Sequence, residues 1–181
     1  MSSTDFRLQF EPSEIPALAK RYSYNQNDDD ALEAGHQIAH GDYSRKNLES
    51  IFRWKTKGRG ISRLGHNSDE DIADALHLAV IAQTERSAVA VLIGLNGVDV
   101  PVASAILTVI DPERYTIIDF RALESLGANV SGKTIGFYLD CLAFCQGLAR
   151  QNNVSLRHLD QALWQWSNER KRQSAVARTG A

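Results

Sequence analysis

The sequence has few cysteines, no long apolar segment and almost no net charge, and each of these features excludes a class of protein. Two cysteines in 181 residues cannot form the disulfide framework of a small secreted domain. Cys141 and Cys145 lie four apart in a helical pattern, so we expect reduced thiols. No apolar stretch reaches about eighteen residues, and the N-terminus lacks the basic start and apolar core of a signal peptide. We therefore expect a cytoplasmic protein with no membrane partner.

The formal net charge is −2 and the isoelectric point is about 6.2, which argues against a protein that coats nucleic acid through bulk charge. Any contact with nucleic acid must therefore be local. Hydrophobic residues make up 43% and charged residues 23% of the chain, as in an ordinary globular protein. A chain of this length is long enough to fold around one hydrophobic core.

Apolar residues recur at helical spacing through most of the chain, and alternating strand-like runs are scarce. This pattern predicts an all-α fold, a single compact domain of seven or eight helices. We expect an N-terminal segment, residues 1–27, with a helix from about Ile15 to Tyr22. The helical domain is expected over residues 28–168, and a flexible basic tail over 169–181.

Capping signals mark where several helices begin. Three aspartates at residues 28–30 favour the start of a helix that runs to about His40. Ser44 is a capping residue for the next helix, and Ser155 is one for the last. Ser68, with an acidic residue three positions later, predicts another helix start of the capping-box type.

Residues 95–101 predict a tight hairpin between two helices. An almost unbroken apolar run precedes them, Asn96-Gly97 is a turn signal, and Pro101 suits the first position of a second helix. Such a hairpin can present backbone N–H groups and a helix N-terminus to a phosphate, so it can bind nucleic acid without reading any base. The candidate nucleic-acid contacts in this hairpin are Asn96, Gly97, Val98, Asp99 and Val100.

Asp119 follows the apolar residues 115–118 and precedes another predicted helix. A carboxylate at a helix start is favoured by the helix dipole, so it should remain ionised at neutral pH. From these properties alone, a purely structural N-cap is the simplest interpretation.

The two segments LNGVDVPVASAIL and IIDFRALESLG together resemble the helix-hairpin-helix DNA glycosylase superfamily, over about forty residues. In that superfamily an aspartate in this place both caps its helix and serves catalysis. It stabilises the positive charge that develops on the sugar as an extruded base departs, and it orients the attacking water. The resemblance implies that Asp119 is the catalytic residue of an enzyme that hydrolyses the N-glycosidic bond of a damaged or modified base in DNA, without a cofactor.

Three positions differ from the pattern of this superfamily. Asp99 replaces the second hairpin glycine, which places a carboxylate where a phosphate usually approaches. Pro101 replaces the lysine that forms a Schiff base, so the resemblance implies a monofunctional glycosylase that uses water. Arg121 stands two places after the aspartate, where His or Asn is common, and either binds a substrate phosphate or pairs with Asp119. Two cysteines cannot hold the iron–sulfur cluster that some members carry, so no cluster and no metal are expected.

A basic run, RWKTKGRGISR, occupies residues 53–63 and contains no acidic residue. Three glycines within residues 57–65 predict an exposed loop between helices. Lys55, Lys57 and Arg59 are the candidates in this run for contacts with a phosphate backbone. A solvated loop without a ligand is an equal alternative.

Three further features have a structural alternative that we favour over a functional one. Trp54 is a candidate for stacking on a displaced base, but packing in the core is the more common use of such a residue. His36 and His40 have the spacing of metal ligands without a third ligand. His158 and Asp160 are expected on the solvated face of an amphipathic helix rather than in acid–base work.

Two other classes of function remain open. The chain is either a glycosylase or a non-catalytic relative of the same fold that binds nucleic acid or a protein, and Asp99 and the acidic isoelectric point favour the second. In a third alternative the fold is purely structural and Asp119 is only a cap. An open cleft beside Asp119, wide enough for a nucleobase, would favour catalysis.

Overall fold

The computed structural model describes residues 5–23, 28–128 and 134–179, and within these ranges all the regular elements are helices. The prediction of an all-α fold is therefore confirmed. A short 3-10 turn, Pro12–Glu14, precedes ten α-helices, which is more than the seven or eight predicted. They are α1 (Ile15–Lys20), α2 (Asp28–Ala39), α3 (Arg45–Thr56), α4 (Ile61–Leu64), α5 (Asp69–Ile81), α6 (Glu85–Leu92), α7 (Val100–Ile110), α8 (Phe120–Ser125), α9 (Ile135–Gln151) and α10 (Leu156–Thr179).

The capping signals in the sequence are used as predicted at several helix starts. Ser68 Oγ accepts the N–H of Asp71 at 3.0 Å, and a carboxylate oxygen of Asp71 accepts the N–H of Ser68 at 3.2 Å. Ser155 Oγ accepts the N–H of His158 at 3.1 Å at the start of α10. These bonds satisfy N–H groups that have no partner within the helix.

Two predicted boundaries differ from the structure. Lys57, Gly58 and Gly60 have φ values of 56°, 77° and 81°, and they turn the chain out of α3 and into α4. Leu64 of α4 is completely buried, so the predicted loop over 57–65 is in part a short, anchored helix. The predicted tail from residue 169 is also different, because α10 continues without a break to Thr179.

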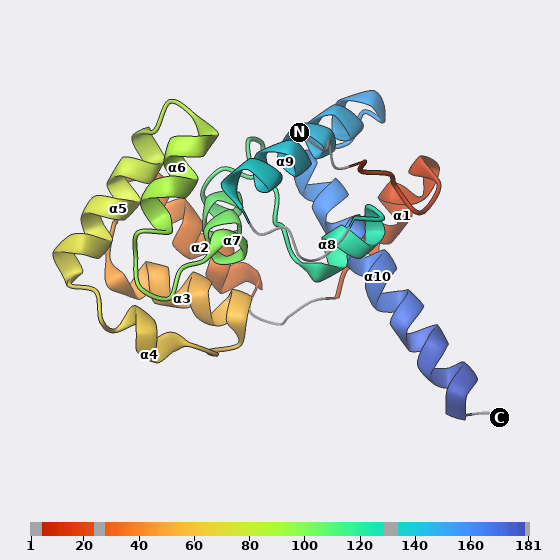
Figure 1. Cartoon of the computed structure of the whole chain (residues 1–181), viewed down its shortest axis with the longest axis horizontal. Coiled ribbons are helices and arrows are strands. Elements are labelled where there is room, and N and C mark those ends of the chain that lie inside the picture. The colour runs from red at the N-terminus through yellow and green to blue at the C-terminus, as the bar shows by residue number, and fades with distance from the viewer. Residues whose placement is uncertain (1–4, 24–27, 129–133, 180–181) are drawn as a thin grey trace.

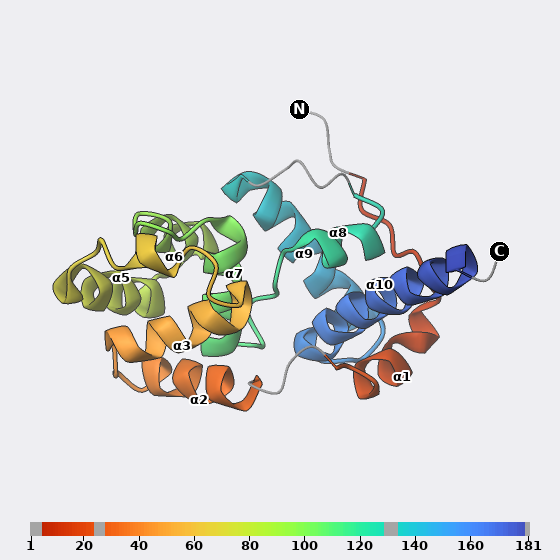
Figure 2. The same ribbon diagram turned by 90° about the horizontal axis from the view of Figure 1, so that it is seen from below.

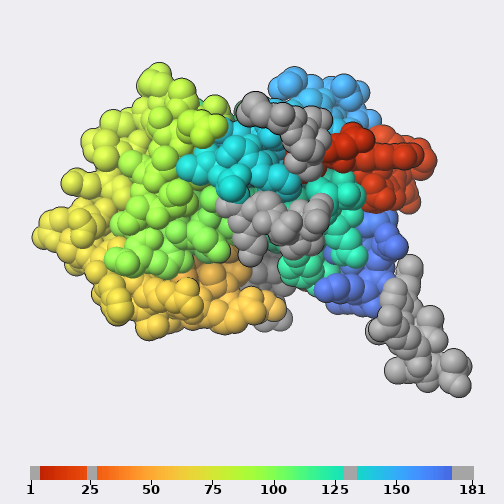
Figure 3. All heavy atoms as spheres, viewed as in Figure 1, coloured from red at the N-terminus to blue at the C-terminus, as the bar shows by residue number. Residues whose placement is uncertain are grey.

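The helices form two halves, which Figures 1 and 2 show side by side. The central half, residues 28–110, contains α2 to α7, and the terminal half contains α1 and α8 to α10. The N-terminal segment belongs to the terminal half, because α1 packs along α10 and the N–H of Arg7 donates to the carbonyl of Leu126 at 2.9 Å. Helix α9 also touches α6, and Figure 3 shows the surfaces of the two halves meeting over this face of the molecule.

Helix α7 is the centre of the central half. Nine of its eleven residues are buried, and it packs against α2, α3 and α6. The contact with α2 depends on Gly35, because a Cβ atom at this position would lie only 2.2 Å from the carbonyl oxygen of Val109. The absence of a side chain therefore lets the two helix backbones approach closely.

We predict that Gly35→Ala lowers the free energy of unfolding by about 1–3 kcal/mol, because the added methyl group forces α2 away from α7. Gly147→Ala in α9 is the matched control, since no atom lies within 4 Å of a Cβ there. It should instead raise stability by about 0.5–1 kcal/mol through helix propensity. Urea unfolding followed by circular dichroism measures both. Equal midpoints for Gly35→Ala and the wild type would contradict the close approach.

Candidate functional site

Asp119 lies at the N-terminus of α8, where its carboxylate has three donors. Oδ1 accepts the backbone N–H groups of Arg121 and Ala122, each at 3.0 Å. Oδ2 accepts a hydrogen bond from the ammonium group of Lys55 at 3.2 Å. The Asp119 side chain is 22% exposed, so it has access to solvent despite these partners. The predicted N-cap is confirmed.

The environment of Asp119 favours the ionised carboxylate. Burial raises its pKa, but the charge of Lys55 and the N–H donors of Ala122 and Arg121 together hold this pKa below the ordinary value. Asp119 is therefore an anion at neutral pH, in a position where little water surrounds it.

Lys55 does not lie on an exposed loop. It belongs to α3 and follows the buried residues Ile51 and Phe52 by four and three positions, which places it on the inner face of that helix. Its side chain is only 11% exposed. The structure therefore places Lys55 beside the carboxylate with its side chain almost buried, whereas the side chains of Lys57 and Arg59, with which the sequence groups it, are exposed.

A cavity of about 310 Å³ opens beside Asp119 between α3, α7 and α8. One part of its wall is apolar and is formed by Pro101, Val102, Ile118 and Leu123. The polar part is formed by Lys55, Arg59, Asp99 and Asp119. An apolar wall with a few convergent polar groups is typical of small-molecule sites, whose volumes are roughly 300–1,000 Å³.

A second hollow of about 720 Å³ lies on the other side of Asp119, between the end of α3, α8 and α10. We call it the basic groove, because its wall includes the cations Lys55, Lys57, Arg59, Arg121 and Arg172. The cavity and the basic groove share Lys55, Arg59, Asp119 and Phe120. Asp119 is thus the point at which the two hollows meet.

Arg121 does not pair with Asp119, although the sequence allowed this. Its guanidinium group lies over the rings of Trp164 and Phe120, at 4.8 and 5.1 Å from their centroids. It also donates to Ser167 Oγ at 3.4 Å. The carboxylate therefore interacts with Lys55, a partner from the other half of the molecule, and Arg121 faces the basic groove.

A buried polar network below the site connects the two halves. Trp54 of α3 donates its ring N–H to Asp28 at 2.6 Å, and Arg157 of α10 lies 3.7 Å from the same aspartate. Arg157 also pairs with Asp160. Trp54 is only 4% exposed, so it packs in the core and does not present a face for a displaced base.

Asp160 was expected on a solvated face, and this expectation is wrong. Asp160 is only 6% exposed, and it lines a small hollow of about 20 Å³ together with Lys55 and Asp119. Burial raises the pKa of Asp160, and the charge of Arg157 opposes that shift. Asp160 lies four residues after Leu156 and three before Leu163, both buried, and this spacing could have placed it on the inner face.

In the turn between α6 and α7, N–H groups of the candidate nucleic-acid contacts are used within the protein. The N–H of Asn96 donates to Oδ1 of Asn67 at 2.8 Å, and the N–H of Val98 donates to the carbonyl of Leu95 at 3.2 Å. Val98 and Val100 have buried side chains. These contacts reduce the number of donors that this turn can offer to a phosphate.

Asp99 has a structural role at the start of α7. Its φ of −103° is extended, so a glycine is not required there, and its carboxylate accepts the N–H of Val102 at 3.0 Å. Gly97 is the residue with a positive φ, 88°, and it packs against α4. Pro101 is the second residue of α7 rather than the first.

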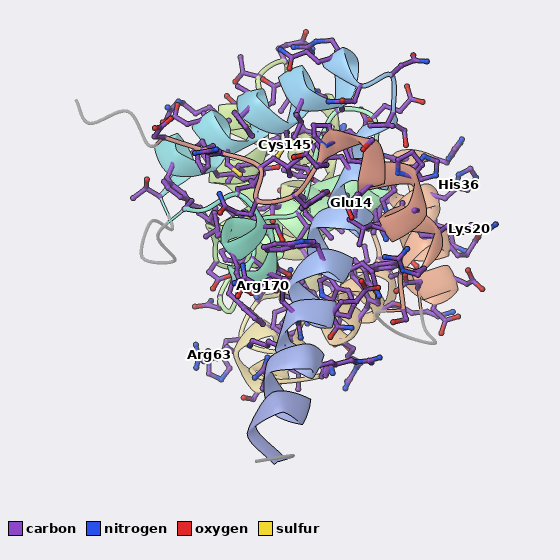
Figure 4. The ribbon with its side chains drawn as sticks, turned by 90° about the vertical axis from the view of Figure 1, so that its right-hand side faces the viewer. Glu14, Lys20, His36, Arg63, Cys145 and Arg170 are labelled. Atoms are coloured by element: carbon purple, nitrogen blue, oxygen red, sulfur yellow. The ribbon has the colours of Figure 1, made fainter. Side chains whose placement is uncertain are left out.

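His36 on α2 and His40, just after the end of α2, have exposed side chains, with ring centroids 4.1 Å apart. In Figure 4, which is seen from the right-hand side of Figure 1, His36 projects outward from the surface. Among the described residues, no group of three or more His, Cys, Asp or Glu side chains is arranged to hold a metal ion. Cys141 and Cys145 are free thiols in the core.

No protein-family model, curated protein or solved structure matches this chain. Over the ranges that the structure describes, no helix has the length and apolar character needed to cross a membrane. A function must therefore be argued from the residues of the site itself.

Proposed function

We propose that this chain is a DNA glycosylase-like hydrolase in which Asp119 is the catalytic carboxylate. In this proposal α6, α7 and the hairpin between them form the helix-hairpin-helix motif. The observation that carries the proposal is an ionised carboxylate that opens on a cavity of about 310 Å³ at the junction of the two halves. Such a cavity has room for one nucleobase, and an open space of this size beside Asp119 favours a catalytic role for the carboxylate.

The residues of the site suit hydrolysis of an N-glycosidic bond. An extruded base enters the cavity, and its sugar lies at the mouth beside Asp119. The bond between C1′ and the base nitrogen breaks, and its electron pair leaves with the base. The Asp119 carboxylate stabilises the positive charge on the sugar. Water then adds to C1′, and the proton that it loses passes to the nitrogen of the departed base. This leaves a neutral free base, a hydroxyl group on C1′ and an abasic site in the strand.

Lys55 brings an amino group to the carboxylate, although position 101 is proline. Its Nζ donates to Asp119 Oδ2 at 3.2 Å, so in this proposal it serves the carboxylate and is not the nucleophile. Water therefore remains the nucleophile in this proposal. The role of Lys55 is to hold Asp119 in its ionised form and in its orientation.

We predict that incubation with duplex DNA containing damaged bases gives abasic sites that break only after treatment with alkali. A panel of duplexes with one modified base each, analysed on denaturing gels before and after alkali, measures this. Strand breakage without alkali, together with protein trapped on DNA by borohydride, would contradict the water mechanism. Trapping that disappears in Lys55→Met would identify Lys55 as the amine.

A second candidate function is a non-catalytic domain that binds nucleic acid or a protein. The observation that favours it is the full set of donors on Asp119, since the two N–H groups and Lys55 already satisfy and neutralise this carboxylate. In that case Asp119→Asn would leave binding unchanged, and no modified base would be released from any duplex of the panel.

A further inference from the structure

We propose that the basic groove binds the phosphates of the DNA strand on either side of the extruded nucleotide. This inference rests on the proposed function, and it assigns the main phosphate contacts to α10, α8 and the end of α3 instead of the hairpin. The base would occupy the cavity while its backbone lies in the groove. Asp119 would then face the sugar that joins them.

The charge of the groove supports a polyanionic ligand. Lys57, Arg59, Arg121 and Arg172 line it, and in the part of the chain that the structure describes none of these four cations forms an ion pair. Asp119 is the one carboxylate in its wall, and Lys55 already pairs with it. A chain with a net charge of −2 therefore gathers unpaired positive charge at one place.

Asn168 is an independent indication of a ligand in the groove. This residue of α10 lines the groove and is 8% exposed, and its buried Nδ2 has no hydrogen-bond partner among the described residues. A buried donor without an acceptor is costly, and rotation of the Asn168 amide towards the groove would let a phosphate oxygen accept from it.

Phe120 adds a surface on which a neighbouring base can stack. It is 46% exposed, and it lines both the cavity and the groove. Arg121 and Lys171 lie over its ring, at 5.1 and 4.5 Å from the centroid. An aromatic ring flanked by cations is the usual platform for an unpaired nucleotide.

The first experiment measures the binding of a fluorescein-labelled single strand and of the corresponding duplex over a salt series. We expect Lys57→Ala/Arg172→Ala to weaken binding about tenfold at low salt. The slope of log affinity against log salt should become shallower by about 0.7 for each lost contact on the single strand, and by about 0.9 on the duplex. The matched control is Arg53→Ala/Arg150→Ala, which removes the same charge from exposed arginines outside the groove. Equal losses of DNA affinity in both double variants would overturn the proposal that the groove binds phosphates.

The second variant is Asn168→Leu, which removes the unsatisfied donor. We expect weaker DNA binding with an unfolding midpoint at least as high as that of the wild type, because an apolar side chain replaces a buried group without a partner. If Asn168→Leu binds DNA as tightly as the wild type, the proposal that the groove binds phosphates is contradicted.

The results also separate this inference from the proposed function. One outcome is that the wild type binds DNA and excises a base while Lys57→Ala/Arg172→Ala binds DNA as tightly as the wild type. In that case the groove does not bind phosphates, and the glycosylase proposal stands. If the groove variants lose affinity but no duplex is excised, the groove is supported and the catalytic proposal fails. If the wild type binds neither the single strand nor the duplex at low salt, both the groove proposal and the glycosylase proposal are wrong.

Discussion

Asp119→Asn is expected to reduce base excision by about a thousandfold or more. The amide oxygen can still accept the N–H groups of Arg121 and Ala122, so the cap on α8 remains. The variant loses only the negative charge that stabilises the cationic sugar. Single-turnover excision of the best duplex substrate measures this effect. Undiminished excision by the variant would overturn the assignment of Asp119.

The same substitution should also reduce stability, because Lys55 loses its anionic partner. An amide N–H group would then face the ammonium, and an almost buried charge would be unpaired, at a cost of about 1–3 kcal/mol. The control is Asp119→Asn/Lys55→Gln, which removes both charges and should recover most of that stability without recovering excision. Thermal unfolding and single-turnover rates of the two variants distinguish a catalytic loss from a folding defect.

The sequence was sufficient to predict several helix starts and the cap at Asp119, because these depend on local chemistry. Helix starts at Ser68 and Ser155 follow from side chains that bond to N–H groups three residues away. Asp119 is a cap of the same kind, so its position at a helix start is visible in sequence. The all-α class follows from the apolar spacing alone.

The partners of Asp119 could not be predicted in the same way, since they come from distant elements. Lys55 lies in a basic run, and residue type alone groups it with Lys57 and Arg59. Only the helical register after Ile51 separates it from them and turns it inward. Asp160 is a similar case, because a charged residue on an amphipathic helix is usually solvated, and its burial depends on Arg157.

Tertiary structure also decides whether DNA phosphates are expected at the turn between α6 and α7 or in the basic groove. The hairpin pattern offers N–H groups to a phosphate, but the sequence does not show that Asn67 occupies one of them. The basic groove combines residues from the end of α3, from α8 and from α10, and the first and last of these lie more than a hundred positions apart. No local pattern brings such residues together, so the groove appears only once the two halves are assembled.

Lys55→Met is expected to move the acid limit of excision to higher pH. In the wild type, burial raises the pKa of Asp119, and the charge of Lys55 is the largest influence that lowers it, so the net pKa is below the ordinary value. Asp119 therefore remains ionised to a lower pH than an ordinary aspartate does. The stability that its charge provides is complete above the unfolded-state pKa and is lost as the pH falls through the folded-state pKa. Without Lys55, burial is opposed only by the N–H donors, and the pKa must rise.

Single-turnover rates from pH 3 to 8 measure this shift, provided that each variant is confirmed as folded at every pH. Arg53→Met is the matched control, because it removes the same charge two residues along the chain from a side chain that is exposed, lies outside the basic groove and is not paired with Asp119. We expect its acid limit to match that of the wild type, since exposed charges are screened by water and salt. Excision by Lys55→Met should persist near pH 8, where its Asp119 is again ionised. An unchanged acid limit in Lys55→Met would show that the ion pair does not control the carboxylate. Loss of excision at every pH, in a folded variant, would instead make Lys55 a direct participant in the reaction.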